Sequence, residues 1–491
     1  MADSATGSDV VGNDWKLTTH PARLFTPLSD GSVQCHLSPR NCVIQPGKSG
    51  YCRVRSNQGG ELVTLNYGKS VAMTEESIET EAVYHYAPGA AILSMGNIGC
   101  MLHCDYCHNW RTSQARYVTD ELVHQYTPEQ VVEEALARNI KVLSWTYNDP
   151  VVWHEFVLDT ARLGQENGLI NLYKSAFFIS LEAASELVDV IDIFSVSVKS
   201  MDPAFYRRVT KGWLEPVLEA TEYVYGRGKH VEVSNLVVTD ANDKPEQTIE
   251  IAEWVLDALD DEIPLHYVRF HPDYKYTKVG RTPIPRLEAA REAALELGIK
   301  YCYLGNVYDN DATDTKCPDC GNLIVHRYGL AAEGVGLTPD GKCASCGVAL
   351  PFKTLDDTVS ASPLSLKGIQ TADPSLPAYE HRWRGDVKAV HIEAHNSSDL
   401  PATIAVRAVG GSRDGELART VPVLPNRSFR FICCKSSPGE DGISVSHPSS
   451  LQLQYFDVYD RAHFPTASVE KAEPVADAIP GPVFKRRAVA S

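Results

Sequence analysis

Short apolar runs alternate with amphipathic stretches between residues 88 and 303. We predict strands for the apolar runs at 90–99, 141–147, 169–176, 190–199, 230–238 and 264–271. We predict helices for the amphipathic stretches at 128–139, 151–168, 180–189, 214–228 and 286–298. Strand–helix alternation of this kind builds a parallel sheet from βαβ units. The fold class is therefore predicted to be α/β, with a partial or full (β/α) barrel.

The rest of the chain divides by composition. Residues 403–409 and 428–434 alternate apolar and polar side chains between turns, which predicts a C-terminal β-sandwich. The expected segments are a disordered N-terminus (1–20), a loop-rich extension with cysteines (21–85), the barrel (86–303), a small cysteine-bearing module (304–352), a linker (353–386), the β-sandwich (387–465) and a disordered tail (466–491).

The charge balance excludes some kinds of partner. The 491 residues include 46 Lys and Arg against 63 Asp and Glu, a net charge of −17. Such an acidic chain argues against nucleic acid or an anionic membrane as its main partner. The first residues show neither the basic start nor the apolar run of a secretory signal, and no apolar stretch approaches the ~20 residues of a membrane span. We therefore expect a cytoplasmic protein.

Thirteen cysteines, most of them clustered, are unusual for a cytoplasmic chain. In a reducing compartment such clusters indicate metal sites more readily than disulfides. Cys100, Cys104 and Cys107 lie in GNIGCMLHCDYC, directly after an apolar run. Their spacing also suits one face of a helix, but Gly96 and Gly99 stand where that helix would begin. Three thiolates on a tight loop favour an iron–sulfur cluster with one open iron.

The spacing C-x3-C-x2-C, with an aromatic residue before the third cysteine, resembles the radical S-adenosylmethionine (SAM) superfamily. The resemblance implies a [4Fe–4S] cluster on the three cysteines, SAM chelating the open iron, and Tyr106 among the cofactor-binding residues. It further implies reductive cleavage of SAM to a 5′-deoxyadenosyl radical that abstracts hydrogen from a substrate. The protein then positions the reactants and excludes water. A low-potential electron donor such as flavodoxin or ferredoxin is implied as a partner.

Further segments make the resemblance more specific. They are similar to radical SAM enzymes related to pyruvate formate-lyase activating enzyme, of the AmmeMemoRadiSam group, and the similarity extends over roughly residues 20–352. The segments are 46–55, 144–161, 214–220, 231–238, 267–275 and 303–307.

The resemblance also assigns residues to the site. Asn148 and Asp149 occupy the place of the family's SAM amino-group motif, and Lys199 matches a lysine near the SAM carboxylate. Asn148 and Asp149 also suit the N-cap of a helix beginning one residue later, and the two roles are compatible. His271 and Arg269 end the sixth strand and would face the same mouth, because barrel active sites form at strand C-termini.

Two departures from the family's pattern indicate a changed substrate. Ser197 stands where relatives usually carry Asp, and Lys174 brings a positive charge to the end of the third strand. Lys174 would suit an anionic substrate through a charge-assisted hydrogen bond; alternatively it is a solvated surface lysine. Cys302, at the end of the last strand-like run, is a candidate for the thiol that an epimerase would need to return hydrogen.

A second cysteine group has the spacing of a zinc ribbon. Two C-x2-C pairs, each followed by glycine, have 22 residues between them. Four thiolates in this pattern close a tetrahedral Zn²⁺ shell, whereas a rubredoxin-like iron or a second iron–sulfur cluster are the alternatives. The residues are Cys317, Cys320, Cys343 and Cys346.

A third cysteine group is incomplete. Cys35, Cys42 and Cys52 resemble a cysteine-rich segment of the family, but Ser38 stands where a further cysteine is common. A fourth ligand would be His36 or solvent, or the site is degenerate.

These patterns together predict a radical SAM enzyme. Its substrate is expected to be a small metabolite, sugar or peptide that undergoes oxidation, epimerisation or rearrangement. A glycyl-radical-enzyme activase of the pyruvate formate-lyase activating type is an alternative. A non-catalytic scaffold that binds through the zinc module and the β-sandwich is an alternative of another class, and the intact cysteine motif disfavours it.

Overall fold

The computed structural model describes residues 14–307 and 310–355 and, further on, 370, 378–383, 389–398, 400, 402–410, 415, 417–423, 428–434 and 441–458. The expected tail at 466–491 and most of the expected linker lie outside these residues. Residues 14–20 were expected to be disordered, but they form a 3-10 turn, Asp14–Lys16, and the start of β1 (His20–Pro21). The reason is the side chain of Trp15, which is buried in the main core.

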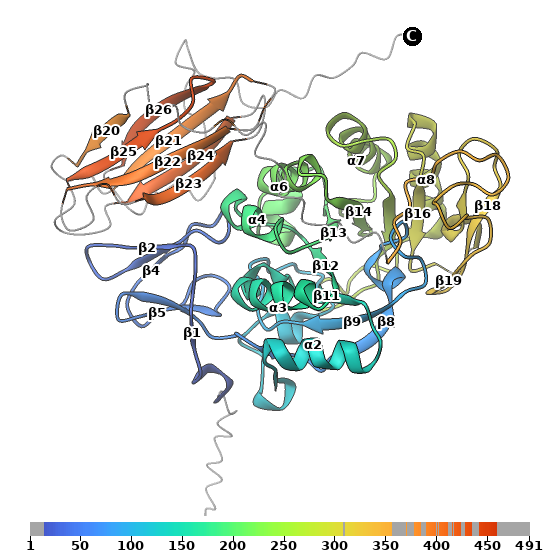
Figure 1. Ribbon diagram of the computed structural model, residues 1–491, viewed down its shortest axis with the longest axis horizontal. Coiled ribbons are helices and arrows are strands. Elements are labelled where there is room, and N and C mark those ends of the chain that lie inside the picture. Colours follow the sequence, from blue (N-terminus) through green and yellow to red (C-terminus); the bar gives the residue numbers. More distant parts are fainter. Residues whose placement is uncertain are drawn as a thin grey trace, which may run out of the picture.

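One eight-stranded sheet forms the centre of the protein, in the order β16-β15-β14-β13-β12-β11-β9-β8 (Figure 1). Its strands are β8 (Thr74–Ser77), β9 (Ala91–Gly96), β11 (Val142–Thr146), β12 (Ile170–Ser175), β13 (Ile193–Ser197), β14 (His230–Val237), β15 (Leu265–Arg269) and β16 (Cys302–Gly305). Neighbours from β9 to β16 pair in parallel, and β8 pairs antiparallel with β9. Because β8 and β16 are the two edges, the barrel is partial.

Helices connect successive strands and cover the outer face of the sheet. The longer ones are α2 (Pro128–Ala137), α3 (His154–Glu166), α4 (Leu181–Leu187), α6 (Glu215–Gly226), α7 (Pro245–Ala258) and α8 (Ile284–Leu297). Shorter turns are η2 (Ile78–Glu81), α1 (Trp110–Ser113), η3 (Asp120–Leu122), η4 (Pro150–Trp153), α5 (Pro203–Phe205), η5 (Tyr206–Thr210) and α9 (Asn310–Thr313). No helix in the described part of the chain is long and apolar enough to cross a membrane.

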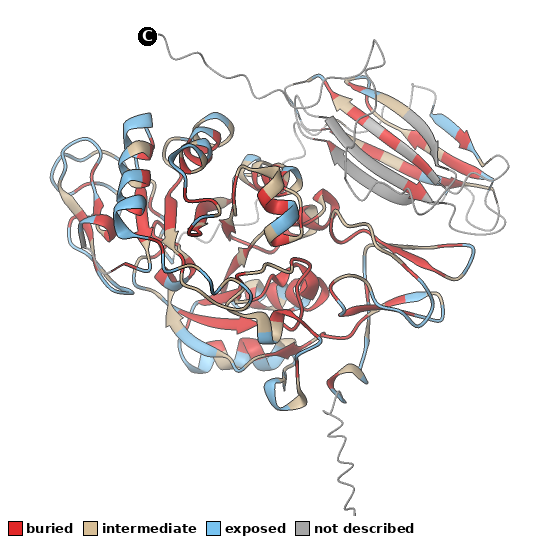
Figure 2. Cartoon of the chain, turned by 180° about the vertical axis from the view of Figure 1, so that it is seen from behind, coloured by how far each residue is buried: buried red, intermediate tan, exposed pale blue. Residues whose placement is uncertain are grey.

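The two faces of the sheet differ in chemistry, because successive side chains on a strand point to opposite faces. Outward positions are apolar and pack beneath the helices; they include Leu143, Trp145, Tyr173, Phe194 and Val233. Two rows of inward positions on β12, β13 and β14 are polar: Lys174, Ser195 and Glu232 lie in one row, with Ser197 and Ser234 in the next. We call the space that these five residues face the lumen. Figure 2 shows that the central strands are mostly buried.

The N-terminal extension forms small sheets that pack on the main core. Its strands are β1, β2 (Phe25–Pro27), β3 (Val33–Cys35), β4 (Val43–Ile44), β5 (Arg55–Gln58), β6 (Glu61–Thr64) and β7 (Lys69–Ser70), the last paired with β10 (His124–Gln125). A buried ion pair fixes the extension to α3: Arg55 Nη1 lies 2.8 Å from Glu155 Oε1.

The second cysteine group lies in a small module that follows β16. Its strands are β17 (Thr315–Lys316), β18 (Leu323–Tyr328) and β19 (Ala331–Gly334). Buried Arg327 docks the module on the barrel, since its Nη2 donates to the Tyr84 carbonyl at 2.8 Å and its guanidinium lies 4.0 Å from the Tyr84 ring centre. The main-chain N–H of Lys353 also donates to the His85 carbonyl at 2.9 Å. These contacts hold the module against the barrel.

The C-terminal strands form two sheets, β20-β25-β22-β23 and β24-β21-β26. Their bounds are β20 (Tyr379–Arg382), β21 (Ala389–Asn396), β22 (Ala402–Val409), β23 (Leu417–Val423), β24 (Ser428–Cys434), β25 (Gly442–Ser446) and β26 (Leu451–Val458). Ile392 on one sheet and Ile404 and Val445 on the other share one buried cluster, so the two sheets pack face to face. Strand β20 lies where a linker was expected, because it pairs antiparallel with β25.

Candidate active site at the strand ends

The first three-cysteine group lies on the loop between β9 and α1. No helix covers residues 100–107, so the interpretation of these cysteines as a helical face is wrong. Gly99 begins the loop with a φ of +92°, a conformation that favours glycine, and a Cβ there would lie 2.8 Å from the Val54 side chain. The loop therefore needs glycine at this position for two separate reasons.

Contacts from other strand ends fix the shape of this cysteine loop. The N–H of Asp105 donates to the Val209 carbonyl at 3.0 Å, and the N–H of Lys275 donates to the Asp105 carbonyl at 2.9 Å. The Asp105 carboxylate also pairs with Lys211 Nζ at 2.8 Å. The loop is therefore held from both sides, by η5 and by the segment after β15.

The three thiols do not converge as the ligands of one ion do. In the described residues, only one group of three or more donor atoms lies within 4.8 Å of one another, and it does not include Cys100, Cys104 or Cys107. Each cysteine ligand of a four-iron cluster binds a different iron, so such a cluster does not need thiols that converge on one point. Cys107 Sγ lies 3.3 Å from the Ser113 hydroxyl, which orients that thiol.

Lys199 brings a positive charge to the cysteine loop. It follows the end of β13, where its N–H donates to the Tyr206 hydroxyl at 3.0 Å. Its ammonium lies close enough to Cys104 and Cys107 to lower the pKa of both thiols, although burial, the larger influence, raises them. Tyr106 is buried against Phe270 behind the loop.

Asp149 presents a buried carboxylate oxygen with no partner. Its Oδ1 accepts from Ser175 Oγ at 2.7 Å and from the Val151 N–H at 3.3 Å, which confirms the N-cap interpretation. Its Oδ2 is buried and has no hydrogen-bond partner among the described residues. Burial raises the pKa of Asp149, while Ser175, the Val151 N–H and the charge of Lys199 oppose that rise. An unsatisfied buried carboxylate oxygen is suited to a cationic ligand.

Asn148 ties this segment to the cysteine loop. Its Nδ2 donates to the Asn97 carbonyl, and also to Thr112 Oγ1 at 3.1 Å. Asn109 Nδ2 in turn donates to the Tyr147 carbonyl at 2.6 Å. Asn148 therefore positions the loop through its amide.

His271 lies beside the cysteine loop, as a residue of the mouth should. Its ring stacks on His108 with centroids 3.7 Å apart, and His108 Nε2 lies 3.0 Å from the His271 carbonyl. Burial, His108 and Arg281 lower the pKa of His271. Arg269, by contrast, is engaged with the Thr282 carbonyl through its Nε at 2.8 Å.

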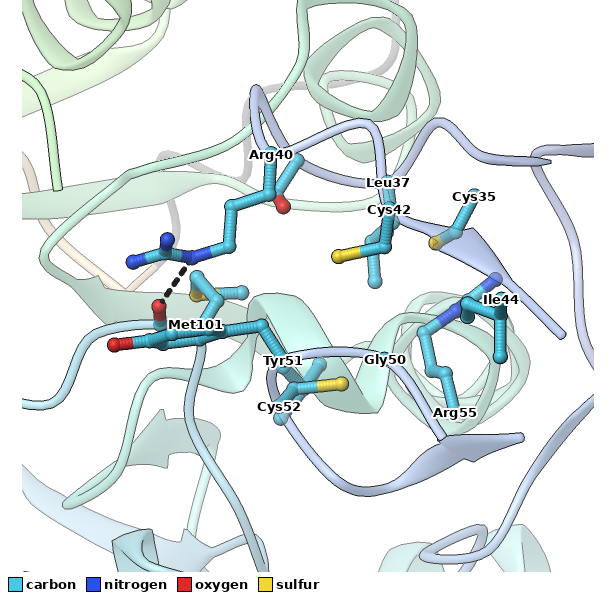
Figure 3. A pocket seen from close by; sticks show the side chains of 12 residues that line it. Cys35, Leu37, Arg40, Cys42, Ile44, Gly50, Tyr51, Cys52, Arg55 and Met101 are labelled. Carbon is cyan, nitrogen blue, oxygen red and sulfur yellow. Dashed lines mark hydrogen bonds between the residues drawn. The ribbon is translucent and has the colours of Figure 1, made fainter. Parts of the chain in front are cut away.

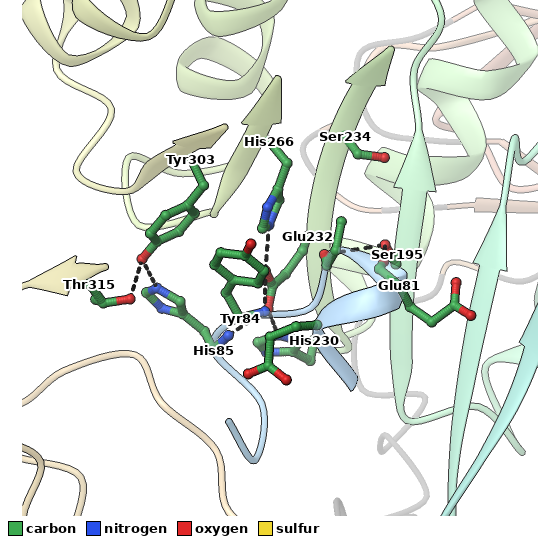
Figure 4. Close-up of polar contacts among 12 residues, drawn as sticks. Glu81, Tyr84, His85, Ser195, His230, Glu232, Ser234, His266, Tyr303 and Thr315 are labelled. Atoms are coloured by element: carbon green, nitrogen blue, oxygen red, sulfur yellow. Dashed lines mark hydrogen bonds and ion pairs between the residues drawn. The ribbon is translucent and has the colours of Figure 1, made fainter. Parts of the chain in front are cut away.

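Lys174 lies inside the lumen and not on the surface, so its interpretation as a solvated surface lysine is wrong. Its Nζ donates to Ser195 Oγ and to Ser234 Oγ, each at 3.0 Å, and Ser234 Oγ lies 3.0 Å from Ser197 Oγ. Burial lowers the pKa of Lys174 to about 8, and the carboxylate of Glu81 opposes the shift. Figure 4 shows Glu81, Ser195 and Ser234 around this part of the lumen.

Glu232, deeper in the lumen, is satisfied by the protein itself. It accepts the N–H groups of Tyr84 and His85 at 2.8–3.0 Å, and His230 and His266 lie at 3.0 and 2.8 Å (Figure 4). Burial alone would raise its pKa, but the two histidines outweigh that and hold the pKa well below its usual range. This carboxylate therefore joins β14 to the segment after η2 and has no free capacity for a ligand.

Cys302 is the first residue of β16 and not at its end, so the placement expected from the sequence is wrong. The apolar run continues for three residues beyond it, and the strand mouth lies at Gly305. The Cys302 thiol is buried in the main core, and burial raises its pKa to about 12. A neutral thiol enclosed in the core is poorly placed to meet a substrate.

The second cysteine group converges tightly. Cys317 Sγ lies 3.7 Å from Cys346 Sγ, and Cys320 Sγ lies 3.7 Å from Cys343 Sγ. All four sulfurs lie within 4.8 Å of one another, which is the spacing for a single tetrahedral ion. After each pair, a glycine with positive φ donates its N–H back to the first cysteine's carbonyl. The donor set suits one metal ion and does not distinguish zinc from iron.

Several residues of the site could not be singled out from the sequence. Ser175 positions Asp149, and Ser113 contacts Cys107. Ser195 and Ser234 hold Lys174. Their signal is weak because serine is common at strand ends and turns. The alternation of serine with valine in the β13 segment was the one visible indication.

Comparison with known proteins agrees with this geometry. The profile of the radical SAM superfamily matches residues 97–255, which contain the cysteine loop and β11 to β14. An uncharacterized protein of Methanocaldococcus jannaschii is 38% identical over 328 residues, which are 66% of this chain and 97% of that protein. The chain therefore belongs to the radical SAM superfamily and is a radical SAM enzyme.

Two further proteins are more distant. The pyruvate formate-lyase-activating enzyme of Listeria monocytogenes is 20% identical over 214 residues, covering 41% of this chain and 85% of that enzyme. The crystal structure of a radical SAM methyltransferase from Sphaerobacter thermophilus is 13% identical, with a TM-score of 0.35 over 48% of this chain and 71% of that chain. The protein is thus a radical SAM enzyme related to pyruvate formate-lyase-activating enzymes.

Proposed function

We propose that this enzyme removes hydrogen from an anionic small molecule or peptide bound in the lumen. A [4Fe–4S] cluster with SAM supplies a 5′-deoxyadenosyl radical as the hydrogen-abstracting group. Cys100, Cys104 and Cys107 would hold the cluster, because one loop carries all three and their sulfurs do not converge as the ligands of one ion do. The reaction also requires a low-potential electron donor of the flavodoxin or ferredoxin type.

The chain offers two charged groups to SAM. The free Oδ2 of Asp149 would accept from the SAM amino group, with Ser175 fixing the carboxylate through its other oxygen. Lys199 would face the SAM carboxylate, since its charge already acts on Asp149 and on two of the cysteines. Asn148 would act on the cofactor indirectly, by holding the cysteine loop.

The observation that carries the substrate proposal is the lysine in the lumen. An ammonium has three N–H donors, and Lys174 uses two of them on Ser195 and Ser234. The third has no acceptor among the hydrogen bonds of the described residues. Lys174 is only half-buried, and the charge of Glu81 offsets part of the cost of its burial. A bound anion would offset more of that cost. A carboxylate or phosphate would accept from Lys174 and from the Ser197 hydroxyl.

The lumen would also keep water from the reaction. The helices enclose its outer face, and a cluster of apolar residues, including Ile92, Val142, Leu172 and Ile193, closes its lower end. His271 and His108 would cover the mouth beside the cysteine loop. A closed chamber matters because a reactive group that is exposed to solvent reacts unproductively.

We propose fewer reactions than the sequence indicated: oxidation or rearrangement, and not epimerisation. Oxidation or rearrangement needs no thiol from the protein, whereas epimerisation needs a hydrogen donor. The buried position of Cys302 removes the residue on which epimerisation depended. The four-cysteine module would hold Zn²⁺ in a structural role, since its sulfurs form a closed set away from the strand ends.

One observation supports a second function. The likeness to the Listeria monocytogenes pyruvate formate-lyase-activating enzyme favours an activase that acts on the backbone of a partner protein. The lumen argues against it, because a glycine backbone has no negative charge for Lys174 to bind.

The proposal is tested with anaerobically reconstituted protein, SAM and a reductant. Metabolites from an anaerobic extract are separated into fractions retained by an anion exchanger and fractions that pass through. Stimulation of 5′-deoxyadenosine formation by a retained fraction supports the proposal. Stimulation confined to the flow-through contradicts an anionic substrate. A glycyl radical detected by EPR on a partner protein would restore the activase function.

A further inference from the structure

The third cysteine group surrounds a pocket in the N-terminal extension. Cys35 ends β3, Cys42 precedes β4, and Cys52 lies in the turn before β5. All three side chains line one pocket, together with Ser38 and Arg55 (Figure 3). Residues distant from one another in the extension thus bring three sulfurs to one space. Nothing in the proposed reaction uses them.

The sulfurs of these three cysteines do not converge as those of a single-ion site do. Four convergent sulfurs of the module beyond β16 lie within 4.8 Å of one another, and Cys35, Cys42 and Cys52 form no such group. The catalytic cysteines are also spaced more widely than that. The same chain thus contains one cysteine set that converges on a single ion and two sets of three that do not. Thiolates that bind different irons of a cubane cluster need not converge on one point.

Two arginines make the pocket suited to a negatively charged occupant. The Arg55 side chain is 1% exposed and lines the pocket, and its Nε is buried without a hydrogen-bond partner in the described residues. Glu155 contacts this guanidinium at Nη1, so it leaves the Nε–H without an acceptor. On the other side, Arg40 lies close enough to Cys42 and Cys52 for their charges to interact. Among the ion pairs of the described residues, Arg40 has no carboxylate partner and Arg55 has only Glu155. A thiolate-bound cluster would bring negative charge to both guanidinium groups.

Arg40 also connects this pocket to the catalytic loop. Its guanidinium lies 3.6 Å from the Tyr51 ring centre, and its Nε donates to the Met101 carbonyl at 2.8 Å. Met101 itself lines the pocket and directly follows Cys100. The two three-cysteine sites therefore adjoin one another.

The candidate for the fourth ligand differs between the sequence and the structure. His36 was one candidate from the sequence, but its Nε2 lies 2.8 Å from Thr26 Oγ1 and its ring does not line the pocket. Ser38 does line it. The fourth position of the site would thus face Ser38.

We propose that Cys35, Cys42 and Cys52 hold a second, cubane-type iron–sulfur cluster, whose fourth position faces Ser38 and whose charge is balanced by Arg40 and Arg55. This site does not depend on the substrate, on SAM cleavage or on the catalytic cysteines.

The test separates this cluster from the catalytic one. The full chain carrying Cys100→Ala, Cys104→Ala and Cys107→Ala is purified anaerobically and reconstituted with iron and sulfide. We expect this variant to retain about three or four iron atoms per chain, with a matching amount of sulfide and a cluster EPR signal. Adding Cys42→Ala should remove that iron. Adding Cys302→Ala, a buried cysteine outside the pocket, should leave it unchanged.

Several results would overturn the proposal. These are a triple variant with no iron, iron that persists after Cys42→Ala, or a metal analysis showing zinc in the pocket in place of iron. Zinc content of the four-cysteine module reports whether each variant is folded. Ser38→Cys, added to the triple variant, gives a second readout in which all three pocket cysteines stay in place: with a fourth thiolate, the cluster should resist a chelator several-fold longer than in the triple variant alone. No change in that lifetime would contradict the placement of Ser38.

Discussion

The pH dependence of turnover follows directly from a lysine in the lumen. Burial lowers the pKa of Lys174 from 10.5 to about 8, with Glu81 opposing the shift and Lys199 adding to it. A lysine is charged below its pKa, so the ammonium that would bind an anion is present at neutral pH. It disappears as the pH rises through about 8. We expect kcat/KM for an anionic substrate to decline along an alkaline limb with its midpoint near that pH.

The size of the effect can be worked from the same shift. One unit below its pKa a group is about nine-tenths protonated, and one unit above it about one-tenth. Turnover should therefore fall about tenfold between pH 7 and pH 9. A hydrogen bond to a charged group contributes about 1.5–3 kcal/mol. Lys174→Gln should then lower kcat/KM at pH 7 by roughly 10- to 150-fold and abolish the alkaline limb.

The assay measures 5′-deoxyadenosine formed with the active anionic fraction at pH 6.5 to 9.5, alongside SAM affinity. SAM affinity should change little in Lys174→Gln, because Lys174 is not placed to bind SAM. Lys300→Gln, at an exposed lysine paired with Glu262, is the matched control and should behave as the wild type. The reasoning is refuted if Lys174→Gln keeps the same alkaline limb, or if it loses SAM affinity and turnover equally.

Stability measurements distinguish a functional lysine from a structural one. The folded pKa is depressed, so between pH 8 and 10.5 the unfolded chain binds more protons than the folded chain. The contribution of Lys174 to the free energy of unfolding therefore rises with pH across that window. Below pH 8 its charge therefore destabilises the fold. Lys174→Met should leave the unfolding midpoint at pH 7 unchanged or raise it; a clear decrease would indicate a structural role.

The remaining predictions concern the other sites. Cys104→Ala should abolish the catalytic cluster and 5′-deoxyadenosine formation while the zinc content stays unchanged; normal iron and activity would contradict the assignment. Asp149→Asn should weaken SAM binding about 10- to 100-fold, measured by calorimetry, with iron content retained. Cys317→Ala should release about one zinc ion per chain, checked by elemental analysis. Glu155→Ala leaves Arg55 buried without its partner and should lower the free energy of unfolding by about 3–5 kcal/mol in denaturant titrations.

The elements of the barrel could largely be predicted from the sequence because their signals are local. The helix predicted at 128–139 is α2, which begins at Pro128 after Thr127 and Gln130 form a capping box. The parallel strands followed from long apolar runs. The run that contains β16 was expected to end near Cys302, where the strand begins. The edge strand β8 was not predicted, since it has four residues and reads Thr-Glu-Glu-Ser. Its strand character depends on pairing with β9 and not on its own composition.

The site was only partly predictable for a different reason. The catalytic cysteines are recognised from spacing along one loop. The partner of Asp149 is Ser175, which lies one strand away, and no local pattern links the two. Cys302 was misplaced because an apolar run does not reveal where the strand within it begins. Position along a strand decides whether a side chain reaches the mouth, and that position depends on register across the sheet.

One feature of the sequence indicates the lumen: polar residues in a strand of the parallel sheet, where apolar residues are usual. Strands of a parallel sheet covered on both faces are apolar at nearly every position. In β13 the inward residues Ser195 and Ser197 alternate with the outward residues Phe194 and Val196, which are buried in the main core. Small polar side chains facing the barrel axis cannot fill it, so they leave room beside Lys174. Alternation inside a parallel sheet is therefore a sequence signal for a chamber, and in this chain it coincides with the one lysine of β12.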